Sequence, residues 1–217
     1  MLGILGGAFD PVHVGHLRLA LELRERVALE RVLLMVAAEP PHREPPQASA
    51  QDRLAMVRLA VEALHTQGIT DVQAEDLELR RRGPSYMADS LERLREREGD
   101  VTLALILGTD AFLGIPRWHR WRRVLAQAHL IVAERPDATL GLAAQETPAW
   151  AQGRIVASAQ ALRAHRAGRI LRLQIPALDI SATAIRAALA QGRGIHFLAP
   201  SVVGEYIERH NLYTRHE

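Results

Sequence analysis

The feature that most constrains the fold is a regular alternation of short apolar segments with longer segments of helical periodicity. The first apolar segment, Leu2 to Leu5, is followed by two glycines and then by apolar residues at helical spacing. Parallel strands need a crossover connection, which is usually a helix, so this alternation predicts an α/β chain with a parallel sheet. The expected strands are residues 2–5, 31–37, 101–107, 129–133 and 169–175, and residues 72–79 are expected to be a strand or an extended segment. The expected helices are residues 14–28, 51–64, 86–97, 182–191 and 201–210.

The length and composition fit one domain. A chain of 217 residues with 48% hydrophobic residues can bury a substantial core. We expect a single domain over residues 1–217, with a Rossmann-like, doubly wound parallel sheet, helices on both faces and a small helical part from about residue 181. Residues 137–168 carry no interpretable motif and are expected to form a surface excursion with short helices.

The residue types exclude several chemistries and compartments. The chain has no cysteine and no lysine, so thiolate, Schiff-base and Walker-lysine chemistry are absent. A net charge of +2 with only local arginine runs does not indicate a nucleic-acid partner. No apolar run reaches the roughly 18 residues of a membrane span, and the N-terminus does not resemble a signal peptide, so we expect a cytoplasmic protein without a membrane partner. The sequence leaves open whether the protein forms a homo-oligomer.

The first strand-to-helix turn carries the clearest chemistry. Gly6 and Gly7 stand where free backbone N–H groups and the positive end of a helix attract an anion. If the helix begins at Val14, then His13 and His16 lie together near its N-terminus, where imidazoles can donate hydrogen bonds to phosphate. The alternatives are an ordinary helix capped by Asp10 with two half-exposed histidines, or a metal pair, which would lack carboxylate ligands.

The string Gly-Gly-Ala-Phe-Asp-Pro-Val-His-Val-Gly-His, residues 6–16, resembles the signature of the nucleotidyltransferase superfamily with a His-x-Gly-His motif. The resemblance implies that this turn binds ATP. The implied ATP-binding positions are Gly6, Gly7, Ala8, Phe9, His13 and His16, of which the two histidines are also the implied catalytic residues.

A second element, residues 179–186, follows an expected strand and opens an expected helix. Ser181 is in position to cap the helix, and Arg186 lies one turn inside it. Taken alone, this is an ordinary capped helix with an exposed arginine. The segment Ile-Ser-Ala-Thr-Ala-Ile-Arg is similar to the second signature of pyridine-nucleotide adenylyltransferases, which implies ATP-phosphate contacts for Ile180, Ser181, Thr183 and Arg186, with Arg186 also catalytic.

Further segments occur in the order found in bacterial nicotinate mononucleotide adenylyltransferases, which the chain resembles over nearly its full length. The resemblance implies that Gly108 and Asp110 bind the adenosine ribose. It also implies an acceptor site, in which His42 and Arg43 hold the mononucleotide phosphate and Trp118 stacks on the pyridine ring. Tryptophans at the spacing of Trp118 and Trp121 more often pack in a core, so Trp121 is expected to belong to the core. The implied substrate-binding positions are His42, Arg43, Tyr86, Met87, Trp118 and His119.

The implied reaction is transfer of AMP from ATP to nicotinate mononucleotide, in NAD biosynthesis. Mg²⁺ is expected to enter with ATP through the phosphates, without dedicated protein ligands. Ala8 stands where the family usually has Thr or Ser, and Met87 where it usually has Thr, so the choice between nicotinate and nicotinamide mononucleotide stays open. A non-catalytic adenine-nucleotide sensor is the alternative from another class, and phosphopantetheine and cytidylyl transfer are disfavoured by the missing lysine and the different second signature.

Overall fold

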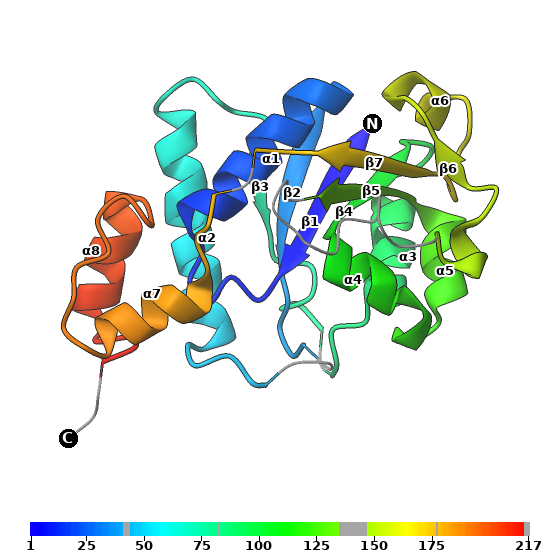
Figure 1. Cartoon of the computed structure of the whole chain (residues 1–217). Helices are drawn as coiled ribbons and strands as arrows, with labels where there is room; N and C mark the ends of the chain where they lie inside the picture. The colour runs from blue at the N-terminus through cyan, green and yellow to red at the C-terminus, as the bar shows by residue number, and fades with distance from the viewer. Residues whose placement is uncertain (41–43, 82, 135–146, 177, 215–217) are drawn as a thin grey trace. The chain divides into compact units, whose positions relative to one another are not determined.

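The computed structural model describes residues 1–40, 44–81, 83–134, 147–176 and 178–214 (Figure 1). Strands and helices alternate along most of this length. The strands are β1 (Leu2–Gly7), β2 (Arg31–Val36), β3 (Val72–Glu75), β4 (Leu103–Gly108), β5 (His129–Glu134), β6 (Ile155–Val156) and β7 (Ile170–Gln174). The helices are α1 (Val14–Val27), α2 (Ala50–His65), α3 (Met87–Glu98), α4 (Thr109–Gly114), η1 (Ile115–Arg117), α5 (Trp121–Gln127), η2 (Ala149–Ala151), α6 (Ala159–Arg163), α7 (Ala182–Leu189) and α8 (Ser201–Arg209).

The strands form one seven-stranded sheet in the order β3-β2-β1-β4-β5-β7-β6. The ladders β1–β4, β4–β5, β5–β7 and β6–β7 are all parallel. The spatial order reverses direction between β1 and β4, as in doubly wound sheets that bind nucleotides beyond the carboxyl ends of their strands. The expected Rossmann-like parallel α/β fold is confirmed.

The chain divides into two compact units. The first comprises Met1–Leu5, Glu22–Val32 and Tyr86–Ala177, and the second comprises Gly6–Leu21, Leu33–Ser85 and Leu178–Glu217. The expectation of a single domain with a small C-terminal helical part stays a prediction.

The core of the first unit is built on its central strands. Leu2 to Leu5 of β1 align with Leu103 to Ile106 of β4, and every residue of β5 is buried. Such continuous apolar strands are typical of parallel sheets that are covered on both faces. At the start of β5 the buried His129 ring bonds to the backbone of two residues: Nε2 lies 3.0 Å from the carbonyl of His165, and Nδ1 accepts from the N–H of Arg169 at 3.1 Å.

The second unit is organised around α2. Ser49 caps this helix by accepting from the N–H of Asp52. The carboxylate of Asp52 accepts from the hydroxyl of Tyr206 on α8 at 2.9 Å. Helix α8 packs beside α2 (Figure 1), and the Tyr206–Asp52 hydrogen bond joins the two helices.

The expected elements match the observed ones within a few residues at their ends, but three short helical segments were not expected. These are α4, η1 and α5, which occupy the stretch after β4. Each is too short to show a full amphipathic repeat, and Pro116 interrupts the pattern. Within 137–168 the described residues form η2, α6 and also the two-residue strand β6, which was not expected.

Candidate active site

The turn after β1 is held in shape by a glycine and a phenylalanine. Phe9 has a positive φ of 52° and is 2% exposed. A Cβ atom at Gly7 would lie 3.2 Å from the Phe9 ring, which is tighter than ordinary van der Waals contact. A side chain at position 7 would therefore force the Phe9 ring to shift by a few tenths of an ångström, while Gly6 remains exposed.

The histidines meet at the start of α1, which begins at Val14 as expected. The rings of His13 and His16 stack, with centroids 3.7 Å apart and an angle of 26° between planes. His13 is 6% exposed, so the alternative of two half-exposed surface histidines is wrong for this residue. The described part of the chain contains no group of three or more His, Asp or Glu residues that could hold a metal ion.

Hydrogen bonding fixes the tautomer of His16. The backbone N–H of His13 donates to Nδ1 of His16 at 3.3 Å. A neutral imidazole that accepts at Nδ1 carries its proton on Nε2. The edge of this ring also contacts Phe9, at 4.9 Å between centroids. His16 is thus oriented by its neighbours with a donor at Nε2.

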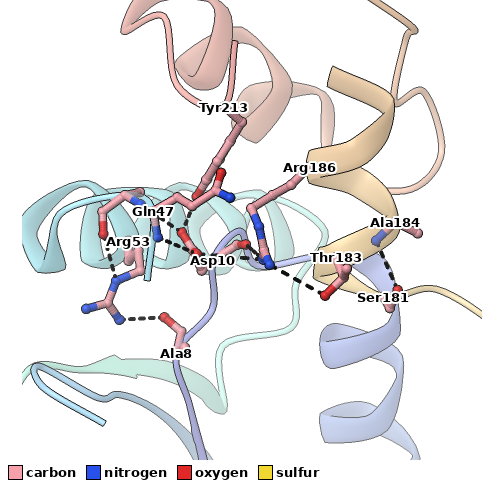
Figure 2. Close-up of polar contacts among 10 residues, drawn as sticks. Ala8, Asp10, Gln47, Arg53, Ser181, Thr183, Ala184, Arg186 and Tyr213 are labelled. Carbon is pink, nitrogen blue, oxygen red and sulfur yellow. Dashed lines mark hydrogen bonds and ion pairs between the residues drawn. The ribbon is translucent and has the colours of Figure 1, made fainter. Parts of the chain in front are cut away.

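The second signature element forms α7 and reaches the first turn. Ser181 caps α7 by accepting from the N–H of Ala184 at 3.1 Å, as expected. Figure 2 shows Arg186 extending from α7 to Asp10, where its Nη1 donates to the backbone carbonyl at 2.7 Å. Nη2 lies 3.5 Å from the hydroxyl of Thr183. Two segments separated by 176 positions therefore meet, and they bring Arg186 to the turn that carries the histidines.

Asp10 does not cap α1. Its carboxylate accepts from the N–H of Gln47 at 2.8 Å, from the N–H of Ala48 at 3.0 Å and from the hydroxyl of Tyr213 at 2.8 Å (Figure 2). The proposed alternative of an Asp10 helix cap is therefore wrong. The first N–H of α1, on Val14, donates instead to the carbonyl of Leu198.

Arg53 supports the same turn from α2. It is 1% exposed, and its guanidinium donates to backbone carbonyls of the turn and of the segment after β2. Burial lowers the pKa of this guanidinium, and the charge of Asp10 opposes that shift. The acceptors are the carbonyls of Ala8 at 2.6 Å, Ala37 at 2.7 Å, Ala38 at 3.1 Å and Ala48 at 3.2 Å. Sequence reasoning missed Arg53, because an arginine in an amphipathic helix reads as a surface residue.

The segment after β2 lines a small cavity. Ser85 accepts from the N–H groups of Ala38 and Glu39 at 2.9 and 3.1 Å. A cavity of about 400 Å³ lies here. Its lining consists of Ala38, Glu39, Pro40, Pro45, Pro46, Ala48, Ala50, Arg53 and Pro84. His42 and Arg43, the expected phosphate-binding pair, lie outside the described residues.

The expected ribose positions lie at the end of β4 in the first unit. Gly108 is the N-cap of α4, and Asp110 stands in the first turn of that helix. Both residues are exposed, so the Asp110 carboxylate is accessible to a ligand. A carboxylate beyond the carboxyl end of a parallel strand is suited to accept hydrogen bonds from ribose hydroxyls.

The expected pyridine-binding residues include an aromatic pair, also in the first unit. Tyr86, the N-cap of α3, stacks on His119 with ring centroids 4.2 Å apart, and Met87 begins the helix. Trp118 is half-buried, and no contact between its indole and another ring is found among the described residues. Trp121 packs edge-on against Trp150, but both side chains are half-buried, so the expected place of Trp121 in the core stays a prediction.

Residues 4–188 match the family model described as cytidylyltransferase-like. The chain is 45% identical over 216 residues to the "Probable nicotinate-nucleotide adenylyltransferase" of Pseudomonas putida (strain GB-1), an alignment that covers 98% of this chain and 94% of that protein. The chain belongs to the nicotinate-nucleotide adenylyltransferase family. The protein with the same name in Methylococcus capsulatus is 42% identical over 215 residues, covering 99% of this chain and all of that one.

Solved structures support the fold. The Plasmodium falciparum nicotinic acid mononucleotide adenylyltransferase complexed with NaAD superposes with a TM-score of 0.72 at 17% identity, and the alignment covers 98% of this chain and 96% of that one. At that identity the similarity concerns the fold alone. Within the part of the chain that the structure describes, no helix has both the length and the apolar character needed to span a membrane.

Proposed function

We propose that this protein transfers AMP from ATP to nicotinate mononucleotide, giving nicotinate adenine dinucleotide and pyrophosphate, in a cytoplasmic step of NAD biosynthesis. The observation that carries the proposal is the meeting of Arg186 with the turn that holds the stacked His13 and His16. Family membership at 45% identity over nearly the full chain supports the choice of acceptor, because that name is carried by the relatives.

In the proposed reaction, an oxygen of the acceptor phosphate attacks the α-phosphorus of ATP in line. The new P–O bond forms as the bond from the α-phosphorus to its bridging oxygen breaks, and pyrophosphate departs with that electron pair. No covalent intermediate on the protein is needed. The work of the side chains is to position the phosphates and to stabilise charge that develops on them.

The second unit supplies the groups for the triphosphate. His16 would donate from Nε2 to a phosphate oxygen, since its Nδ1 already accepts from the backbone, and His13 would act beside it. Arg186 would hold the pyrophosphate, together with the hydroxyl of Thr183 and the N-terminal end of α7. Backbone contacts to ATP are proposed for Gly6, Gly7, Ala8, Phe9, Ile180 and Ser181.

Roles toward the nucleosides and the acceptor phosphate are proposed from the family resemblance. Gly108 and Asp110 would bind the adenosine ribose, and Trp118 would stack on the pyridine ring. Tyr86, Met87 and His119 would complete the pyridine site, with His42 and Arg43 on the acceptor phosphate. Because Met87 has no hydroxyl, discrimination at the pyridine carboxylate would depend on backbone N–H groups.

Mg²⁺ is proposed to arrive with ATP, where it neutralises phosphate charge. Because magnesium keeps most of its waters and binds through substrate phosphates, this proposal requires no protein ligand set.

The test is to give the purified protein ATP and Mg²⁺ with nicotinate mononucleotide, nicotinamide mononucleotide or phosphopantetheine, and to follow pyrophosphate. We expect the highest kcat/KM with nicotinate mononucleotide. A preference for nicotinamide mononucleotide would change the assigned acceptor. ATP binding without pyrophosphate release from any acceptor would instead identify a nucleotide sensor.

A further inference from the structure

Asp10 is buried at a junction of four separate segments of the second unit. It is 5% exposed and contacts residues far from it in sequence. Its Oδ1 accepts from Tyr213 near the C-terminus and from Ala48, and its Oδ2 accepts from Gln47 (Figure 2). An ionised carboxylate has about four acceptor positions, so these three donors occupy most of them.

Arg186 is a further charged neighbour of this carboxylate, beside Arg53, and its contact is loose. The distance from Nη1 of Arg186 to Oδ2 of Asp10 is 3.7 Å, longer than a charge-assisted hydrogen bond. Nη1 donates to the backbone carbonyl of Asp10 instead, at 2.7 Å. Nε of Arg186 is buried and has no hydrogen-bond partner among the described residues. The guanidinium is therefore held in place by the Asp10 carbonyl, and its ion pair with the Asp10 carboxylate is long and not hydrogen-bonded.

Tyr213 is well placed to donate a hydrogen bond to the Asp10 carboxylate. Its ring is 9% exposed, and its hydroxyl lies 2.8 Å from Oδ1 of Asp10. Burial and the negative charge of Asp10 raise the pKa of this phenol. The hydroxyl therefore stays protonated at neutral pH and acts as the donor.

We propose that Tyr213 and Asp10 form a positioning pair for Arg186. The Tyr213 hydroxyl holds the Asp10 carboxylate away from a bidentate pair with Arg186, while the Asp10 carbonyl fixes the guanidinium. The positive charge of Arg186 is thereby kept available for an anionic ligand. This inference rests on the proposed function, in which that ligand is the departing pyrophosphate.

The chain provides a matched control in Tyr206. This residue also lies in the C-terminal part and also donates to a carboxylate, that of Asp52, at 2.9 Å. Asp52 accepts in addition from Ser49 at 2.6 Å. The Tyr206–Asp52 bond stabilises the docking of α8 on α2. Among the described residues, no hydrogen bond joins this pair to Arg186 or to the turn that carries His13 and His16.

The experiment compares Tyr213→Phe with Tyr206→Phe. Both variants lose one hydroxyl and should lose a few degrees of Tm. We expect Tyr213→Phe to lower kcat about tenfold and to weaken binding of inorganic pyrophosphate by a similar factor, because one preorganised charge is partly lost to an ion pair. Tyr206→Phe should stay within about twofold of the wild type in both measurements. Equal kcat and equal pyrophosphate affinity in the two variants would overturn the positioning pair.

A double substitution tests whether the effect acts through Arg186. In an Arg186→Gln background, Tyr213→Phe should cause no further loss of kcat or pyrophosphate affinity, because the group that it positions is absent. If Tyr213→Phe lowers kcat and pyrophosphate affinity in the Arg186→Gln background as much as it does in the wild type, the proposal is overturned. If the wild type binds pyrophosphate but turns over no acceptor, the proposed function fails while the binding comparison still tests the pair. If the wild type does not bind pyrophosphate, both proposals fail.

Discussion

At the scale of single residues, the site depends on the orientation of the two stacked imidazoles. His16 is oriented by the backbone N–H of His13 and by the edge of Phe9. His13 lies against Gly15, at which an added Cβ would be 3.0 Å from Nδ1 and 3.1 Å from Cε1 of the His13 ring. An added methyl group at this glycine of the His-Val-Gly-His segment would therefore force the His13 ring to shift by a few tenths of an ångström.

We predict that Gly15→Ala lowers kcat by about tenfold or more, because the added methyl group displaces His13 from its stack with His16. Alanine is the better helix former, so the free energy of unfolding should change little. The measurement is kcat together with the Tm.

Gly204→Ala in α8 is the control for this substitution. No atom lies within 4 Å of a Cβ at Gly204, so activity should be unchanged and stability should rise slightly. Wild-type activity in Gly15→Ala would show that the His13 position does not matter.

At the scale of elements, Arg53 joins α2 to the first turn through four backbone carbonyls. We predict that Arg53→Leu lowers the free energy of unfolding by about 2–4 kcal/mol, because buried carbonyls lose their donor. Urea denaturation followed by circular dichroism measures this change.

Arg58 on the same helix provides the comparison. Its side chain is 60% exposed and forms one ion pair, with Asp76. Arg58→Leu should therefore change stability by only about 0.5 kcal/mol or less. If the two leucine variants were equally stable, the anchoring role of Arg53 would have to be abandoned.

Strand β5 gives a prediction about pH. Burial lowers the pKa of His129. The unfolded chain then binds more protons, and stability is lost as the pH falls from the ordinary histidine pKa of about 6.5 toward the lower folded value. The Tm of the wild type should fall from pH 7.5 to pH 5.5 more steeply than that of His129→Gln. Parallel curves would contradict the neutral, buried state of His129.

The elements also show what the sequence could predict. The strands β1, β4 and β5 are continuous apolar runs, and α1 and α2 have clear helical spacing, so their positions followed from periodicity. The positions of α4, η1 and α5 could not be predicted in this way. Helices of one or two turns have too few residues to define an apolar face. Ser181 was predictable as a cap since the cap is a local interaction.

At the scale of the whole molecule, the site depends on contacts between residues distant in sequence, which local patterns do not encode. Asp10 and Tyr213 are 203 positions apart, and the expected local role of Asp10 as a helix cap was wrong. The histidine turn and Arg186 were predicted through resemblance to a family, but their meeting through Asp10 required the fold. The roles of the residues in the first unit, Asp110 and Trp118 among them, remain predictions.

The most direct test of the account is the rate of dinucleotide formation by the wild type and by His16→Ala, with ATP, Mg²⁺ and nicotinate mononucleotide. The account predicts equimolar nicotinate adenine dinucleotide and pyrophosphate from the wild type. His16→Ala should be slower in kcat by about 10²-fold or more, as is typical for loss of one preorganised donor to developing charge. Normal turnover by His16→Ala, or ATP consumption by the wild type without the dinucleotide, would contradict it.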